Sequence, residues 1–188
     1  MKIFLINPPR LMNLMSAAMK PSPSLGLALI AGALKEKKHT IKVIDAIAEA
    51  PDQYTSFEKD IVLNGLNEIQ IADMIDPDVD IIGLSLMFSG NWLHNKILLE
   101  VLGEKFPYAK IIAGGEHITA AAKFCIENTN HLDVCICGEG EETIVELIDG
   151  FEKQSDLSNI KGIVYRDEEN NVIENPRRLR IKDIESIA

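Results

Sequence analysis

The chain has 188 residues and a formal net charge of −10 at pH 7, and 46% of its residues are hydrophobic. This length suits one domain with a short appendage, and the hydrophobic content is enough for a packed core. The negative charge disfavours a nucleic-acid binder, which needs clustered Lys and Arg, and it disfavours docking on an anionic membrane surface. No stretch approaches the roughly 20 apolar residues that span a bilayer. We therefore expect neither nucleic acid nor membrane among the partners.

The three cysteines, Cys125, Cys135 and Cys137, form no CxxC pair and no disulfide framework. Free thiols are typical of a reducing compartment, and the first apolar run (residues 3–6) is too short for a signal peptide, so a cytoplasmic location is expected. The histidines lack zinc-site spacing, and no GxSxG elbow occurs. The residues by themselves predict no metal ligand set and no catalytic residue.

Short β-branched runs alternate with longer helical patterns along the chain. The expected strands are 2–6, 40–45, 79–85, 110–113 and 132–137, and the expected helices are 25–38, 65–75, 92–106, 118–128 and 141–151. Segments 7–24 and 46–64 are interpreted as irregular, and Ser24 as the N-cap of the first helix. Buried strands joined by helices indicate a parallel sheet with right-handed crossovers. The predicted fold class is therefore α/β, a three-layer doubly wound (Rossmann-like or flavodoxin-like) sheet of five parallel strands.

The last segment has a different pattern. Residues 162–166 and 172–174, joined by 167–171, predict a β-hairpin, and an extended basic stretch follows. We therefore expect a main domain over residues 1–155, with a hairpin and linker over residues 156–188.

Two glycine-rich turns follow neighbouring strands of the predicted sheet. They are Gly114-Gly115-Glu116-His117 and Gly138-Glu139-Gly140-Glu141, and each opens a helix. Glycine permits positive φ and lacks Cβ, so a ligand can lie directly on the backbone, although such turns also use glycine for geometry alone. Neither turn is a Walker A loop or a dinucleotide fingerprint. Because the glutamates repel a bare phosphate, a large and mostly uncharged ligand fits better.

Three more loops should lie at the same carboxyl edge of the sheet, where ligands of such folds bind. Asn7-Pro8-Pro9 supplies an amide that both donates and accepts, on a chain that proline holds extended. Met12, Met15 and Met19 either form an adaptable apolar ligand face or fold back into the core. Gly26, next to Leu25 at the start of the first helix, again allows close approach.

The third of these loops runs from Ser85 to Gly90 and places two hydroxyls around apolar bulk that includes Phe88. Ser85 and Ser89 either hydrogen-bond a ligand edge or cap the helix that begins near Asn91.

Six motifs in one order carry a resemblance to a known family. They are Ile6-Asn7-Pro8-Pro9, Pro23-Ser24-Leu25-Gly26-Leu27-Ala28, His39…Val43-Ile44-Asp45-Ala46, Ile82-Gly83-Leu84-Ser85, Ala113-Gly114-Gly115-Glu116-His117 and Gly138-Glu139-Gly140-Glu141-Glu142-Thr143. In these motifs the chain resembles the N-terminal cobalamin (vitamin B12)-binding domain of class B radical S-adenosylmethionine (SAM) enzymes. That family includes methyltransferases and the anaerobic magnesium-protoporphyrin monomethyl ester cyclase. The resemblance covers about residues 1–155 and continues through the hairpin, which in the family leads into the radical SAM domain.

Two family motifs are absent. Other cobalamin proteins carry DxHxxG after the first strand, whose histidine binds cobalt from below, whereas this chain has Asn7-Pro8-Pro9-Arg10 and no histidine before His39. It thus resembles the branch that binds cobalamin without a histidine on cobalt. The CxxxCxxC motif that holds an iron–sulfur cluster is also missing. The [4Fe-4S] cluster and SAM would therefore belong to a radical SAM domain expected downstream, and the fragment alone would not be catalytic.

The resemblance also implies a set of cobalamin contacts. The loops after the first and third strands would contact the corrin ring, and the two glycine turns would flank the slot for the nucleotide tail. The implied residues are Asn7, Pro8, Pro9, Leu25, Gly26, Ser85, Phe88, Ser89, Gly114, Gly115, Glu116, His117, Gly138, Glu139, Gly140 and Glu141.

The parent chain would then be a methyltransferase or an oxidative cyclase. One alternative is a stand-alone corrinoid carrier or sensor. A less favoured one is a flavodoxin-like or receiver-like domain, because a receiver needs an acidic residue where this chain has Leu84-Ser85.

Overall fold

A computed structural model describes residues 1–13, 23–167 and 169–179 of the chain. Its centre is a seven-stranded sheet in the order β10-β9-β8-β7-β6-β1-β3. Five strands are parallel: β1 (Lys2–Asn7), β3 (Thr40–Asp45), β6 (Ile81–Ser85), β7 (Lys110–Gly114) and β8 (Val134–Ile136). The hairpin of β9 (Ile163–Arg166) and β10 (Val172–Glu174) extends the sheet in antiparallel fashion beside β8. The predicted five-stranded parallel sheet and C-terminal hairpin are both confirmed.

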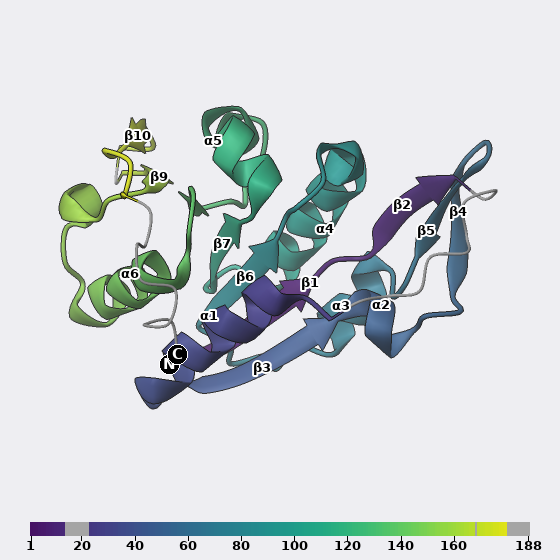
Figure 1. Cartoon of the computed structure of the whole chain (residues 1–188), viewed down its shortest axis with the longest axis horizontal. Helices are drawn as coiled ribbons and strands as arrows, with labels where there is room; N and C mark the ends of the chain where they lie inside the picture. The colour runs from purple at the N-terminus through teal and green to yellow at the C-terminus, as the bar shows by residue number, and fades with distance from the viewer. Residues whose placement is uncertain (14–22, 168, 180–188) are drawn as a thin grey trace.

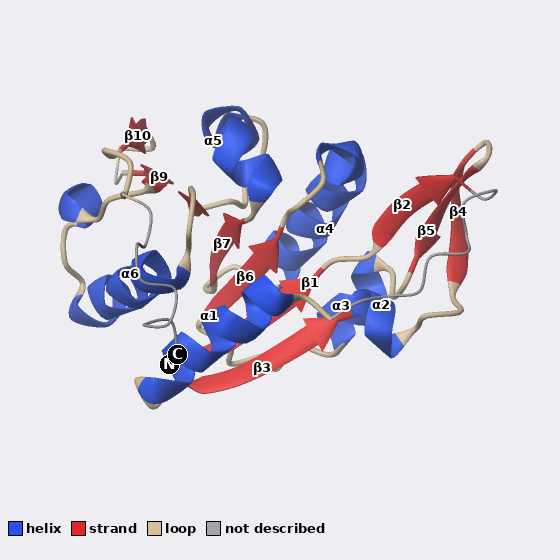
Figure 2. Ribbon diagram, viewed as in Figure 1, coloured by secondary structure: helices blue, strands red, loops and turns tan. Residues whose placement is uncertain are grey.

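Helices cover both faces of this sheet (Figures 1 and 2). One layer contains α1 (Leu25–Glu36) and α6 (Glu141–Lys153), and the other contains α3 (Glu68–Asp73), α4 (Trp92–Lys105) and α5 (Glu116–Glu127). Short helices α2 (Ala46–Glu49), η2 (Ser89–Asn91) and η3 (Leu157–Asn159) lie in the connections. None of the helices in the described part of the chain is long and apolar enough to cross a membrane.

Alternation along β1 shows how the sequence divides the core between these layers. Ile3 and Leu5 are buried in a cluster with residues of α1 and α6, whereas Phe4 and Ile6 are buried in a cluster with residues of α3, α4 and α5. Successive side chains of a strand point to opposite faces, so an uninterrupted apolar strand is the pattern that a sheet covered on both sides requires. At the start of α1, Ser24 Oγ accepts a hydrogen bond from Leu27 N at 3.4 Å, which confirms the expected N-cap.

A second, smaller sheet occupies segments that were expected to be irregular, and that expectation is wrong. Its strands are β2 (Arg10–Asn13), β5 (Ile61–Asn64) and β4 (Tyr54–Glu58), paired antiparallel in the order β2-β5-β4. It projects beyond the carboxyl ends of β1 and β3 (Figure 1). Asn91 fastens it to the loop after β6, because Asn91 Oδ1 accepts from Leu11 N at 3.2 Å and Asn91 Nδ2 donates to Pro9 O at 3.4 Å.

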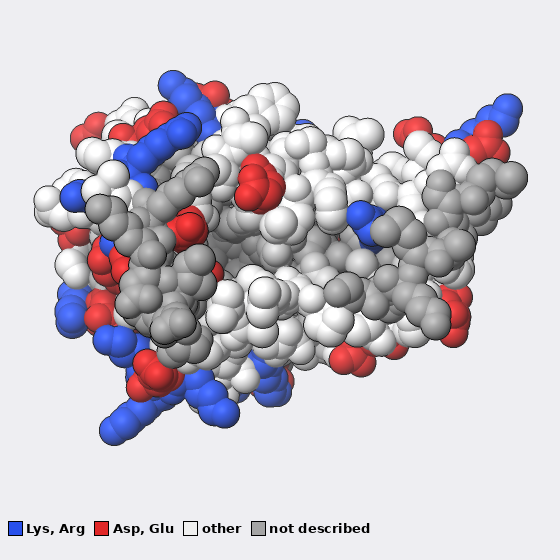
Figure 3. Space-filling view, in the orientation of Figure 1, with Lys and Arg blue, Asp and Glu red and all other residues white. Residues whose placement is uncertain are grey.

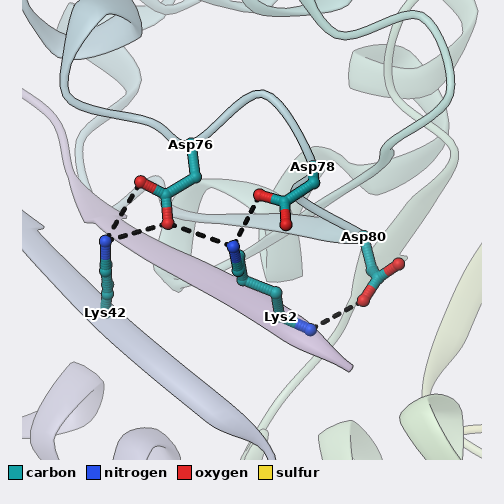
Figure 4. Close-up of polar contacts among 5 residues, drawn as sticks. All are labelled: Lys2, Lys42, Asp76, Asp78 and Asp80. Atoms are coloured by element: carbon teal, nitrogen blue, oxygen red, sulfur yellow. Dashed lines mark hydrogen bonds and ion pairs between the residues drawn. The ribbon is translucent and has the colours of Figure 1, made fainter.

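The amino ends of β1, β3 and β6 are joined by a charged cluster (Figure 4). Lys2 Nζ hydrogen-bonds Asp78 and lies 3.3 Å from Asp76, which also accepts from Lys42 Nζ, while the Lys2 backbone N–H donates to Asp80. The hydrogen bond with Asp78 raises the pKa of Lys2, and hydrogen bonds to lysine lower the pKa values of Asp76 and Asp78. These groups are solvated, so salt screens them. The cluster lies at the opposite end of the strands from the glycine turns.

Candidate functional site

An open cavity lies at the carboxyl edge of the parallel sheet. After β1 the chain first forms β3 on one side of β1 and then forms β6, β7 and β8 on its other side. The strand order therefore reverses at the β1–β6 junction, and such a switch point is where folds of this kind bind ligands. Beside it, a cavity of about 220 Å³ opens over β6, β7 and β8 between α1 and α6. The face in Figure 3 has a central depression ringed mostly by uncharged side chains, with acidic groups at its margin. This opening is suited to a largely neutral ligand.

Nine of the sixteen predicted site residues line this cavity together. They are Gly26, Ser85, Gly114, Gly115, Glu116, Gly138, Glu139, Gly140 and Glu141. They come from the start of α1, the end of β6 and the two glycine turns. The convergence of these segments at one edge was predicted, and the structure bears that geometry out.

The interior of the cavity is apolar, and glycines leave it open. Leu5, Ile112 and Ile136 are among its lining residues. At Gly26 an added Cβ would meet nothing within 4 Å, whereas at Gly83 it would stand 2.9 Å from Leu5 Cδ2. A side chain at Gly26 would therefore extend into free space, and a side chain at Gly83 would crowd the floor of the cavity. An apolar cavity of about 150 Å³ accommodates benzene in another protein, so this one has room for a two-ring aromatic group, and a macrocycle must stay at its mouth.

Backbone contacts hold the two glycine turns in place. Gly115 has φ +107°, and an added Cβ would stand 2.7 Å from the carbonyl oxygen of Leu86, so this turn requires glycine. Leu86 N donates to Gly114 O at 2.7 Å, which ties the loop after β6 to the loop after β7. Gly138 has φ +85° and donates its N–H to Thr119 Oγ1 at 2.9 Å, which ties the loop after β8 to α5. Hydrogen bonds therefore link the loops after β6, β7 and β8 along this part of the rim.

A carboxylate at the cavity has unused hydrogen-bonding capacity. Glu141 Oε2 is buried and has no hydrogen-bond partner among the described residues. Its position in the first turn of α6 stabilises negative charge through the helix dipole. A buried acceptor without a partner is costly, so a ligand that brings an amide N–H or a hydroxyl would satisfy it.

Five other predicted residues lie around the cavity but not in its lining. Asn7 Nδ2 donates to Asp45 Oδ1 at 3.1 Å, and Pro8 and Pro9 are buried. Leu25 is 72% exposed, and Phe88 is 52% exposed beneath the guanidinium of Arg10, 4.5 Å from its ring centre. The Asn7 amide thus braces the loop, while Leu25 and Phe88 present apolar surface to solvent. Of the methionines, Met12 lies in β2, whereas Met15 and Met19 lie outside the described residues.

Ser89 and His117 contact each other at the rim. Ser89 Oγ lies 2.9 Å from His117 Nδ1, and His117 Nε2 lies 3.3 Å from Cys125 Sγ. The helix-capping alternative for Ser89 is wrong, since the N-cap of α4 is Asn91 and makes no side-chain cap hydrogen bond. The His117 side chain is turned inward, is 6% exposed, and burial lowers its pKa.

Gly83 and Thr119 line the cavity but are not among the sixteen predicted site residues. The signal for Gly83 is a lone glycine inside a β-branched strand, which often marks close approach of a ligand or backbone. Thr119 carries no local signal, because its role depends on a neighbouring loop.

Residues 14–148 match the family model of the B12 binding domain. The chain belongs to the B12-binding domain family. Within the described part of this B12-binding domain, no group of three or more His, Cys, Asp or Glu side chains is placed to hold a metal ion.

The curated relatives are methyltransferases and a cyclase by name. An uncharacterized methyltransferase of Pyrococcus horikoshii is 28% identical over 100% of this chain and 37% of its own length. Cytidylyl-2-hydroxyethylphosphonate methyltransferase of Streptomyces wedmorensis is 27% identical over 79% of the chain and 28% of its own length. An anaerobic magnesium-protoporphyrin IX monomethyl ester cyclase of Synechocystis is 26% identical over 98% of the chain and 34% of its own length. The B12-binding domain thus spans about a third of the length of these relatives.

Solved structures share the fold. The cobalamin-dependent SAM radical enzyme OxsB, with aqua-cobalamin and SAM bound, superposes with a TM-score of 0.71 at 22% identity, over 95% of this chain and 22% of that one. The radical SAM methyltransferase TsrM of Kitasatospora setae superposes with a TM-score of 0.66 at 14% identity, over 93% of this chain and 30% of that one. The resemblance to cobalamin-binding domains of radical SAM enzymes is confirmed.

Proposed function

We propose that this B12-binding domain holds cobalamin at the carboxyl rim of its sheet as the N-terminal module of a radical SAM enzyme. The nucleotide tail enters the cavity between α1 and α6, and the corrin ring lies over the loops after β1 and β6. The observation that carries this proposal is the apolar cavity of about 220 Å³, which Gly26 and Gly83 keep open.

The chemistry of the cavity fits the parts of cobalamin. The interior suits the aromatic base of the tail, whereas a corrin ring is too large for it and rests on the mouth. The ring carries neutral amide side chains, which agrees with the mostly uncharged rim in Figure 3. Its amides and the ribose hydroxyl offer the donors that Glu141 Oε2 lacks. Cobalamin then supplies methyl-transfer or redox chemistry, while the chain binds and orients it.

We further propose that no histidine of this chain ligates cobalt. The chain has four histidines, and none of them lines the cavity. His39 contacts the amino group of Met1, and His94 pairs with Glu68 between α3 and α4. Removing an axial nitrogen ligand shifts the potential and reactivity of a bound metal.

The C-terminal segment supports a fixed connection toward a radical SAM domain. After β10, Asn175 Nδ2 donates to the carbonyls of Leu157 and Ile160, both at 2.8 Å. Arg178 Nε donates to Thr143 Oγ1 at 2.8 Å on α6. We therefore propose that residues 1–155 form the cobalamin-binding domain and that residues 156–188 lead out of it, with residues 180–188 lying beyond the described part. Relatives of this fold bind SAM and a [4Fe-4S] cluster, which we assign to the downstream domain.

The principal test is a titration of the 188-residue chain with hydroxocobalamin, followed by its visible absorbance. Saturable binding is expected, and absence of any spectral change at high micromolar ligand contradicts the proposal. The alternative of a corrinoid carrier predicts the same binding. The genomic reading frame separates the two, because an enzyme requires a CxxxCxxC motif downstream.

A further inference from the structure

A buried imidazole supports an exposed hydroxyl at the rim. Ser89 lies in η2, directly after the loop that leaves β6, and its side chain is exposed. His117 lies in the first turn of α5, after the neighbouring strand, and is 6% exposed. The Oγ···Nδ1 distance between them is 2.9 Å. This contact joins two loops that the backbone already ties together, since His117 N donates to Leu86 O at 3.1 Å.

The far side of the imidazole is fixed as well. His117 Nε2 lies 3.3 Å from the Sγ of Cys125, a fully buried residue eight positions further along α5. The His117 ring also packs on Trp92, with ring centres 5.1 Å apart. Burial raises the pKa of Cys125 to about 11, so its thiol keeps its proton at neutral pH and the pair carries no charge. The ring therefore has partners at both nitrogens and on one face.

Stability alone does not account for this arrangement. An exposed serine hydroxyl can hydrogen-bond water, so it does not need a protein partner. Burying an imidazole, in contrast, costs desolvation, which is the cause of the lowered pKa of His117. An apolar side chain would fill the space beside Trp92 at lower cost. The buried ring is explained if its purpose is to hold the hydroxyl.

We propose that His117 is a positioning residue that holds the Ser89 hydroxyl toward the corrin periphery, and that Cys125 fixes the orientation of its ring. The proposal rests on the cobalamin site described above. If Nδ1–H donates to Ser89, the hydroxyl proton is free to donate to a corrin amide oxygen. If the hydroxyl donates to Nδ1, its lone pairs accept from a corrin amide N–H. His117 then acts on cobalamin through Ser89 and does not touch it.

Three variants test this assignment by hydroxocobalamin titration. Ser89→Ala removes the hydroxyl from an exposed position and leaves the fold intact. His117→Gln places its amide near the Nε2 position and so loses the hydrogen bond to Ser89. His117→Asn places its amide near the Nδ1 position and keeps that hydrogen bond. We expect Ser89→Ala and His117→Gln each to weaken binding about three- to tenfold, the range for one lost hydrogen bond, and His117→Asn to stay within about twofold. The double variant Ser89→Ala/His117→Gln is expected to bind no more weakly than either single variant.

Thermal unfolding of the same variants separates binding from packing. Both His117 variants lose packing on Trp92, so a purely structural role predicts that they lose stability and affinity to similar extents. Equal affinities of the Gln and Asn variants, or wild-type affinity of Ser89→Ala, would overturn the positioning role. Failure of the wild-type chain to bind would instead overturn the proposed function itself.

Discussion

The carbonyl oxygen of Leu86 occupies the place that a side chain at Gly115 would need. An added Cβ at Gly115 would stand 2.7 Å from that oxygen, and the residue has φ +107°. The close approach lets the loop after β6 lie against the turn that opens α5. The two walls of the cavity rim are thus brought together by the absence of one side chain.

Gly115→Ala should therefore destabilise the domain. A backbone conformation that L-residues rarely adopt costs about 1–3 kcal/mol, and overpacking adds about 1–3 kcal/mol, so we expect the free energy of unfolding to fall by about 2–6 kcal/mol. Urea denaturation measures this. Gly90→Ala is the matched control, because a Cβ there meets nothing within 4 Å, and it should change the free energy by less than about 0.5 kcal/mol. Equal effects of the two substitutions would contradict the close approach.

Gly26→Leu should separate stability from ligand binding. Nothing lies within 4 Å of a Cβ at Gly26, and leucine is the better helix former by about 0.8 kcal/mol, so the chain should be at least as stable as the wild type. The same side chain extends toward the cavity, so hydroxocobalamin affinity should fall at least about tenfold, equivalent to 1.4 kcal/mol.

The control for this substitution is Ala28→Leu. Ala28 lies on the same helix, is exposed, and does not line the cavity. Ala28→Leu should leave the affinity for hydroxocobalamin within about twofold of the wild type. Unchanged binding by Gly26→Leu would place the ligand elsewhere.

Acid should weaken the fold through His94. His94 is 2% exposed, and burial lowers its pKa below 6.5, although the hydrogen bond with Glu68 acts in the opposite direction. Its Nδ1 has no partner in the described part of the chain, so a second N–H would be buried without an acceptor. Between the folded and unfolded pKa values the unfolded chain binds more protons, so stability falls as pH drops below about 6.5.

Urea midpoints between pH 7.5 and 5.5 test this pH dependence. The wild type should lose stability over that range, with His117 contributing in the same direction because burial lowers its pKa too. His94→Gln should show a smaller decrease. A pH-independent wild-type midpoint, or an identical slope in the variant, would refute the role of His94.

Arg178 should hold the C-terminal segment against α6. It donates to Thr143 and pairs with Glu142 and Glu146, and its own side chain is only 15% exposed. Arg178→Gln should lower the free energy of unfolding by about 1 kcal/mol and speed tryptic cleavage after Arg177. Unchanged cleavage would show that these contacts do not restrain the segment.

Local signals in the sequence were sufficient for the main sheet and the hairpin. The hairpin turn is stabilised within itself, since Asp167 Oδ1 accepts from the backbone N–H groups of Glu169 and Asn171. Uninterrupted apolar strands likewise predicted a sheet covered on both faces. The small sheet was missed because β2 pairs with β5 about fifty residues away, and because β2 and β4 are short strands without a buried residue.

The site was predictable where it depends on strand ends and not where it depends on side-chain direction. Strand order brings Gly26, Ser85 and the glycine turns to one edge whatever the details. The direction of the His117 side chain depends on which face of α5 lies against Trp92. The need for glycine at position 83 depends on the Leu5 side chain in the adjacent strand. Those are relations between elements that no single segment encodes.

The most direct test compares the affinity of the chain for cobalamin with its affinity for cobinamide, a corrinoid that lacks the nucleotide tail. If the cavity between α1 and α6 receives the tail, cobalamin should bind at least about tenfold more tightly, and Gly26→Leu should reduce that preference toward one. Equal affinities of the wild-type chain for the two corrinoids would contradict the account.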